Sequence, residues 1–379
     1  MSKLEIVPVQ SPADLRAFID LPWKIYREHP NWVPPLKKVV RRMLDPLEHP
    51  YWKFAERILL LARRNSETVG RIAGIVDNNY NRYQKTGMGI WGFFECENDL
   101  DAAQGLFSSV EDWVSGKGMT YLCGPFNPST NYEIGMLTEG FEHRATFMMP
   151  YNPPYYVELA EKCGLRKEKD LFSYIVDRNW QSPEWMERIA ERLKKDGRFT
   201  IRTHSRKTSS VEEVVALIRK IYDECWSDNW GFVPTTDGEV SELAWNLEKF
   251  ADEDLIFFVY FNEEPIGAAL MVPDINPILK RLNGKLGLIG MLKYLVYKKE
   301  VNGVRGLLLG IKKKFQEMGV PFLLLYHALG VAYGKDQYKY LELGWNLEDN
   351  HAINQLEEEG GAKLFKKYRI FRKTCQDRW

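Results

Sequence analysis

A strand, turn and strand pattern occurs twice in this 379-residue chain, at residues 58–77 and again at residues 255–274. The two occurrences share three residues at a constant offset of 197 positions: Asn65, Gly70 and Asp77 recur as Asn262, Gly267 and Asp274. The offset is about half of the chain. A repeat of this size predicts two copies of one fold, each long enough to form its own hydrophobic core.

The two copies share further segments in the same order. The tripeptide Lys-Ile-Tyr closes the first helical segment at 24–26 and at 220–222, and an asparagine-tryptophan segment ending in proline follows at 31–34 and 229–234. Strands and helices then alternate in both halves. This order predicts an α+β fold in which each copy is a mixed, mostly antiparallel sheet flanked by helices. We expect an N-terminal domain at 1–179, a helical linker at 180–198 and a C-terminal domain at 199–379.

Composition is ordinary for a soluble globular protein, with 45% hydrophobic and 27% charged residues. The formal net charge is zero, which argues against a nucleic-acid partner. Five widely spaced cysteines lack the paired spacing of a zinc site or a disulfide framework, so we expect reduced thiols and no metal. No apolar run approaches the ~20 residues needed to span a bilayer. These features favour a cytoplasmic enzyme.

One segment is locally basic. Residues 278–314 contain ten Lys or Arg and one acid, Glu300, with many apolar residues between the charges. The segment can lie on an anionic membrane, as a peripheral contact on the inner membrane face, or flank the phosphates of a cofactor. It can equally be a core helix with a solvated basic face. The sequence leaves these alternatives open.

Two patches of the second copy carry a family resemblance. Residues 316–321 follow the third core strand, with Gln316, Gly319 and Pro321, and precede a predicted helix at 319–332. Backbone N–H groups at a helix N-terminus can hold a diphosphate, and glycine allows close approach. Downstream, Asn350 opens a helix and Gly361 follows eleven residues later, before a closing strand. Together the patches resemble the GNAT superfamily of acyl-CoA-dependent N-acyltransferases, although Pro321 replaces the last small residue of its Q/R-x-x-G-x-G/A loop.

The resemblance implies an acetyl-CoA or longer acyl-CoA donor and a site in the second copy. In this superfamily the fourth and fifth strands separate and the pantetheine arm lies in the gap. Lys314 also lies where positive charge can meet phosphates, or on a solvated turn. The residues implied for binding the donor are Ile311, Lys312, Lys313, Gln316, Gly319, Val320 and Asn350.

Acyl transfer to an amine needs a base, and the leaving thiolate needs a proton. Glu342 is the leading base because it lies on the strand that lines the gap; Glu348 and His327 follow. The superfamily often places a proton-donating tyrosine seven residues after its helix-opening asparagine, but here that residue is Glu357. A glutamate serves this role only if burial raises its pKa. The tyrosines that can substitute are Tyr340, Tyr326 and Tyr368, each equally suited to packing.

The first copy differs at the equivalent position. Residues 95–101 contain four carboxylates where a diphosphate would lie, so we expect this copy to have lost donor binding. A long loop rich in glycine, proline and aromatic residues follows, and such loops are often functional. It either covers the domain or shapes an acceptor pocket. The pocket residues would be Asn131, Tyr132, Glu133, Tyr155 and Tyr156.

Three functions remain open on the sequence. The leading hypothesis is an acyl-CoA-dependent N-acyltransferase acting on a small-molecule or lipid amine, and the basic apolar segment favours a fatty acyl donor or a sphingoid-like acceptor. The second is an aminoacyl-tRNA-dependent peptidyl transferase, a class that also uses tandem GNAT-like domains. The third is a ligand-binding or assembly protein without catalysis, which Pro321 and Glu357 keep open.

Overall fold

The structure is a computed structural model that describes residues 3–203, 210–248, 252–287, 292, 294 and 296–375. The chain forms two compact units. Unit 1 comprises Met1–Leu171, Leu279–Lys293 and Lys366–Trp379, and unit 2 comprises Phe172–Ile278 and Tyr294–Phe365. Each unit therefore takes in residues from both halves of the sequence, and the last strand of the chain completes the sheet of unit 1.

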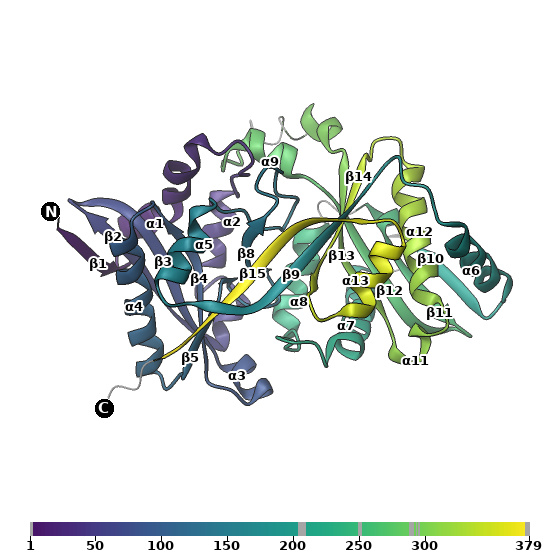
Figure 1. Cartoon of the computed structure of the whole chain (residues 1–379), viewed down its shortest axis with the longest axis horizontal. Coiled ribbons are helices and arrows are strands. Elements are labelled where there is room, and N and C mark those ends of the chain that lie inside the picture. The colour runs from purple at the N-terminus through teal and green to yellow at the C-terminus, as the bar shows by residue number, and fades with distance from the viewer. Residues whose placement is uncertain are drawn as a thin grey trace. The chain divides into compact units, whose positions relative to one another are not determined.

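Unit 1 is built on a mixed sheet (Figure 1). Strands β1 to β4 are antiparallel neighbours, β5 runs parallel to β4, and the end of β15 is antiparallel to β5. The short strand β8 also pairs with β15, while β6 and β7 form a separate pair. The strands are β1 (Leu4–Pro8), β2 (Ala55–Arg64), β3 (Glu67–Asp77), β4 (Met88–Cys96), β5 (Tyr121–Gly124), β6 (Phe126–Asn127), β7 (Glu133–Ile134), β8 (Met136–Glu139) and β15 (Lys363–Thr374).

Helices cover this sheet. Helix α4 lies against β2 and β3 (Figure 1) and buries Leu106, Phe107 and Val110 in a core shared with Ile72 and Trp91. The amphipathic spacing of these residues explains why the segment is helical. The helices of unit 1 are α1 (Pro12–Ile25), η1 (Tyr26–Glu28), α2 (Lys37–Met43), η2 (Pro50–Lys53), α3 (Asn78–Gln84), α4 (Leu100–Gly116) and α5 (Tyr155–Lys162).

Unit 2 repeats the plan. Strands β10 to β13 are antiparallel neighbours, β14 runs parallel to β13, and β9 adjoins β14. The strands are β9 (Arg166–Asp177), β10 (Phe199–Thr203), β11 (Ile256–Phe261), β12 (Glu264–Pro273), β13 (Gly303–Ile311) and β14 (Tyr340–Leu347). The helices are α6 (Glu184–Lys195), α7 (Val211–Trp226), α8 (Asp237–Glu248), η3 (Glu253–Leu255), α9 (Asn276–Leu282), η4 (Lys298–Glu300), α11 (Lys313–Gln316), α12 (Val320–Gly334) and α13 (His351–Glu359). The predicted α+β fold with mixed, mostly antiparallel sheets is confirmed.

The recurring asparagines and glycines have structural roles. Asn65 and Asn262 turn the two hairpins with φ values of 51° and 46°, a left-handed conformation that asparagine tolerates better than most residues. Gly70 and Gly267 allow close packing, because a Cβ would lie 2.8 Å from Leu106 Cδ1 in one copy and 2.3 Å from Ile311 Cδ1 in the other. These residues explain the fold of the repeat rather than its chemistry.

The recurring aspartates hold the same local structure in each copy. Asp77 accepts hydrogen bonds from the Tyr80 backbone N–H at 2.8 Å and from the Tyr51 hydroxyl at 3.0 Å. Asp274 accepts from the Asn276 N–H at 3.1 Å and from the Tyr340 hydroxyl at 2.5 Å. Each carboxylate thus begins a short helix, α3 or α9, that sequence periodicity did not reveal.

Candidate active site

The parallel strand pair separates in both units. Met88–Ile90 of β4 pair with residues 121–123 of β5, and residues 303–305 of β13 pair with residues 340–342 of β14. In unit 1 the pairing register between β3 and β4 shifts between Arg71 and Ala73 of β3. In unit 2 the register between β12 and β13 shifts between Leu270 and Met271 of β12. Such a β-bulge bends a strand. Parallel pairing therefore covers only three residues of β4 and three of β13, and the strands separate beyond them. That a pantetheine arm lies in this gap stays a prediction.

In unit 1 the chain itself fills this gap. Phe126 is fully buried, and its carbonyl oxygen lies 1.8 Å from the position that a Cβ on Gly92 would take. The bulged Phe93 N–H donates to Oδ1 of Asn127 at 2.6 Å. Residues 88–94 of β4 are all buried as a result. A side chain and its backbone thus occupy the place where a ligand would meet β4.

The helix that follows β4 begins at a carboxylate. Asp99 accepts the Ala102 backbone N–H at 3.1 Å and caps α4. Arg64 holds the same carboxylate in a bidentate pair, with Nε at 2.7 Å and Nη2 at 2.8 Å from the two oxygens. The positive end of the helix dipole therefore already faces a negative charge. That the first copy does not bind a diphosphate stays a prediction.

The equivalent strand of unit 2 is more open. Residues 306–309, around the bulge of β13, are half-buried, whereas the matching part of β4 is buried. Helix α12 begins at Gly319, which has a φ of +85° and provides no side-chain cap. Gln316 folds back and donates from Nε2 to the Ile311 carbonyl at 2.8 Å, which fixes the loop before the helix. Val320, the first helical residue, is fully buried.

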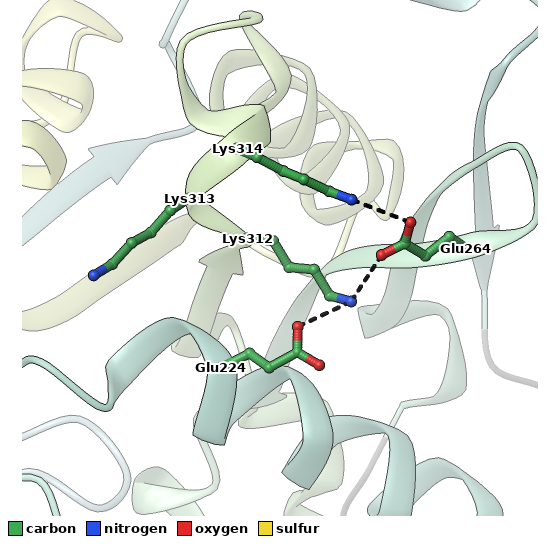
Figure 2. Close-up of a pocket in the computed structure, with 5 residues that line it drawn as sticks. All are labelled: Glu224, Glu264, Lys312, Lys313 and Lys314. Atoms are coloured by element: carbon green, nitrogen blue, oxygen red, sulfur yellow. Dashed lines mark hydrogen bonds and ion pairs between the residues drawn. The ribbon is translucent and has the colours of Figure 1, made fainter.

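Lysines and carboxylates line a pocket of about 400 Å³ at this loop (Figure 2). Lys312, only 12% exposed, lies 2.9 Å from Glu224 of α7 and 3.1 Å from Glu264 of β12. Lys314 lies 3.3 Å from Glu264, while Lys313 points away from Glu264 and pairs with Asp228. Two of the three lysines thus pair with the two glutamates of the pocket, and the third pairs with Asp228. Sequence inspection did not find these glutamates, because they lie on distant elements and carry no motif.

Glu342 and Tyr340 lie two residues apart on β14, so they share a face of the strand. Glu342 is fully buried, accepts from the Ser173 hydroxyl at 2.6 Å, and stands opposite Arg305 in the β13–β14 register. The Tyr340 hydroxyl donates to Asp274. Their catalytic roles stay predictions; Glu342 is buried, and Tyr340 is half-buried with its hydroxyl on the buried Asp274.

Glu357 of α13 is 3% exposed, and Asn346 of β14 donates to its Oε2 at 2.8 Å. Burial raises the pKa of Glu357 to about 8, because the ionised form is poorly solvated there. The condition for a glutamate to carry a proton near neutral pH is therefore met. Asn350, at the start of the same helix, makes no capping hydrogen bond with its side chain.

Three further candidate tyrosines lie in unit 1. Tyr368 of β15 is fully buried, beside Gly135. The Tyr155 hydroxyl donates to the Cys96 carbonyl at 2.8 Å, and the Tyr156 hydroxyl donates to Glu95 at 2.8 Å while accepting the Cys96 N–H at 2.9 Å. Both tyrosine hydroxyls therefore form hydrogen bonds with residues 95 and 96 at the end of β4.

The other loop residues lie elsewhere in unit 1. Tyr132 packs against the rings of His49 and Tyr51. The Asn131 N–H donates to the Ser129 hydroxyl, and Glu133 is exposed on β7. A role of the five loop residues in acceptor binding stays a prediction.

The described residues add three findings. None of their helices is long and apolar enough to cross a bilayer. Within them, no group of three or more His, Cys, Asp or Glu is arranged to hold a metal ion. Part of the predicted basic segment, residues 288–291, 293 and 295, lies outside the described residues.

Comparison with solved structures defines the fold. A tandem GNAT protein from the clavulanic acid biosynthesis pathway matches with a TM-score of 0.58 over 100% of both chains, at 11% identity. The fold is therefore that of the tandem GNAT proteins, as the resemblance predicted. No protein-family model matches the chain.

Curated relatives give the family. A bacterial ceramide synthase from Caulobacter vibrioides is 33% identical over 379 residues, covering 98% of this chain and 97% of the relative. Protein YghO from Escherichia coli is 30% identical over 372 residues, covering 95% of this chain and 93% of the relative. The chain belongs to the family of these two proteins.

Proposed function

We propose that the chain is an acyl-CoA-dependent N-acyltransferase whose acceptor is the amino group of a lipid, with a sphingoid base as the leading case. The observation that carries this proposal is the 33% identity, over 98% of the chain, to a bacterial ceramide synthase. A ceramide is an N-acylated sphingoid base, so formation of this amide is the reaction that the relative's name describes. The open β13 and the uncapped α12 support the donor half of the proposal.

The donor would bind in unit 2. Its diphosphate would meet the backbone N–H groups at the start of α12, where Gly319 provides no competing carboxylate. Lys312 and Lys313 would supply positive charge, and the pantetheine arm would follow the half-buried residues 306–309. The whole proposed set is Ile311, Lys312, Lys313, Gln316, Gly319, Val320 and Asn350.

Binding the donor requires the lysines to exchange partners. Glu224 and Glu264 are 42% and 44% exposed, so both carboxylates can turn into water when phosphates arrive. Ion pairs of exposed groups contribute at most about 1 kcal/mol each. The pairs therefore hold the lysines near the loop at little cost to binding.

The chemistry is an acyl transfer. The amine nitrogen attacks the thioester carbonyl carbon, the new C–N bond forms, and the C–S bond breaks. A base takes the amine proton, and an acid gives a proton to the thiolate. We propose Glu342 as the base. Tyr340 and Tyr368 remain proposed acids, and Glu357 joins them because its raised pKa leaves it protonated near pH 7.

A lipid acceptor and a long-chain donor both reside at membranes. We therefore propose a peripheral contact through the basic segment 278–314, where Leu286, Leu292 and Val296 are exposed among the basic residues.

The test is a reconstitution with purified full-length protein. Long-chain acyl-CoA and sphinganine are incubated together, free thiol is measured, and the N-acyl product is detected by mass spectrometry. We expect product that depends on both substrates, and more product with long-chain acyl-CoA than with acetyl-CoA. Absence of product with every amine tested, or binding of no CoA ester in calorimetry, would contradict the proposal. Product formed only from an aminoacyl-tRNA would point to the peptidyl transferase class.

A further inference from the structure

The turn after α9 is anchored on unit 1. The indole N–H of Trp23 donates to Asn283 Oδ1 at 2.7 Å, and the Lys37 backbone N–H donates to the Gly284 carbonyl at 3.0 Å. Gly284 packs directly on Trp23, since a Cβ there would lie 2.3 Å from Trp23 Cζ2. Gly284 also has a φ of +78°, which favours glycine. The turn therefore contacts the start of α2 (Figure 1).

Both joined segments expose aliphatic side chains. Val39 of α2 is 47% exposed, and Leu286, two residues after the anchored glycine, is 53% exposed. Leu47, in the loop that follows α2 in the chain, is 96% exposed. A soluble domain tolerates single exposed aliphatic residues, but such residues on two anchored neighbours point to an interaction surface.

The charge around Val39 and Leu286 is mainly positive, whereas Leu47 lies between Asp45 and Glu48 and Lys37 pairs with Asp20. Residues 36–44 contain four Lys or Arg and no acid, and residues 275–287 contain three Lys or Arg and no acid. Lys38, Arg41 and Lys285 are exposed. Exposed aliphatic groups among cations match the chemistry of an anionic lipid surface, where the cations meet headgroups and the aliphatic groups enter the acyl boundary.

We propose that α2 and the turn at 283–286 form one docking surface of unit 1 for an anionic membrane. The basic segment of the second copy thus acts together with a helix of the first copy. This inference goes beyond the proposed reaction, since it names the elements of unit 1 that meet the lipid and needs no acyl transfer to be true.

The test uses full-length protein and two kinds of vesicle, phosphatidylcholine alone and equimolar phosphatidylcholine and phosphatidylglycerol. We expect binding only to the anionic vesicles, weakened by salt. Replacing one cation by an acid, as in Lys38→Glu or Arg41→Glu, should lower the partition coefficient from water to the anionic vesicle about fivefold or more. The double variant Val39→Glu with Leu286→Glu should abolish binding. Leu364→Glu, at a residue 46% exposed on β15, is the matched control and should bind as the parent does.

Thermal unfolding confirms that each variant folds. Failure of the parent to bind anionic vesicles, equal binding to both vesicle types, or an equal loss in Leu364→Glu would overturn the proposal. Preference for RNA over vesicles would also overturn it. Acyl transfer to a detergent-dispersed amine is measured in parallel. Transfer without vesicle binding rejects only this surface, whereas vesicle binding without transfer rejects only the proposed function.

Discussion

The two helices that follow the bulged strands begin in opposite ways. Helix α4 begins at Asp99, whose carboxylate caps the helix and pairs with Arg64. Helix α12 begins at Gly319, which leaves the positive end of the helix without a side-chain cap. The two copies share the fold of the strands, but the helix that follows the bulged strand is capped by a carboxylate in one copy and by a glycine in the other. We propose that this difference decides which copy binds a diphosphate.

The gap between the parallel strands shows the same contrast. Phe126 and Asn127 occupy it in unit 1, while the middle of β13 stays half-buried in unit 2. The first copy thus uses this part of its sheet for packing, and the equivalent part of β13 in the second copy is less buried.

The buried carboxylates of the two copies should respond in opposite directions to removal of charge. Glu95 accepts from Tyr156 and lies 3.5 Å from Arg71, whose side chain is almost fully buried. Glu95→Gln would leave that guanidinium without its counter-charge and should destabilise the protein by about 3 kcal/mol. Burial raises the pKa of Glu357 to about 8, so Glu357→Gln should stabilise the protein at alkaline pH. Denaturant unfolding measures both.

The pH profile adds a sharper test for Glu357. Its pKa is about 8 in the folded chain, against an ordinary value of 4.5. Below pH 4.5 both states are protonated, and the variant should match the parent. As pH rises from 4.5 to 8, the unfolded chain loses the proton first, so the parent should lose a few kcal/mol relative to Glu357→Gln. A constant difference across this range would contradict the burial argument.

The start of α12 should bind acyl-CoA poorly when it carries a carboxylate, as the start of α4 does at Asp99. Gly319→Asp places a carboxylate near the diphosphate and should weaken acyl-CoA binding about a hundredfold. Gly319→Asn is the matched control, because asparagine has nearly the same shape, tolerates positive φ and carries no charge. Calorimetric titration of both variants with acyl-CoA separates charge from strain, and equal losses would reject the charge argument.

The lysines of the loop should differ in their effects. Lys312 is held between two glutamates and is 12% exposed, whereas Lys313 is 62% exposed. A fixed charge loses less freedom on binding, so Lys312→Met should raise the KM for acyl-CoA about tenfold, and Lys313→Met should raise it less than threefold. Steady-state kinetics at low salt provide the measurement. The reverse order would place the phosphates on the outer side of the loop.

The smallest effect is expected at Glu264, which competes with phosphates for Lys312 and Lys314. Glu264→Gln should strengthen acyl-CoA binding by about two- to fivefold, the range of an exposed ion pair. The gain should shrink with added salt. Weaker binding in this variant would mean that the glutamate positions the lysines rather than competing for them.

Local sequence signals predicted most of the secondary structure. The strand, turn and strand segments predicted at 58–77 and 255–274 are observed as β2–β3 and β11–β12, and the helix predicted at 319–332 is observed as α12. Apolar periodicity and capping residues act within a few positions, so they can be read from the chain. The short helices α3 and α9 were missed because their signal is one aspartate rather than a period.

The candidate site was less predictable, because its decisive contacts join distant residues. Lys312 meets Glu264 and Glu224, which lie 48 and 88 positions away. Asn127 reaches the bulge of β4 across 34 positions, and no local pattern reveals that it fills the gap. Burial of Glu357, which sets its pKa, likewise depends on packing of α13 against the sheet.

The central claim is that one copy binds the donor and the other does not. Titration calorimetry or native mass spectrometry of the full-length chain with a long-chain acyl-CoA counts the sites directly. We predict one molecule bound per chain, lost in Gly319→Asp and kept in Asp99→Ala. Two molecules per chain, or a single site that survives Gly319→Asp and disappears in Asp99→Ala, would contradict the account.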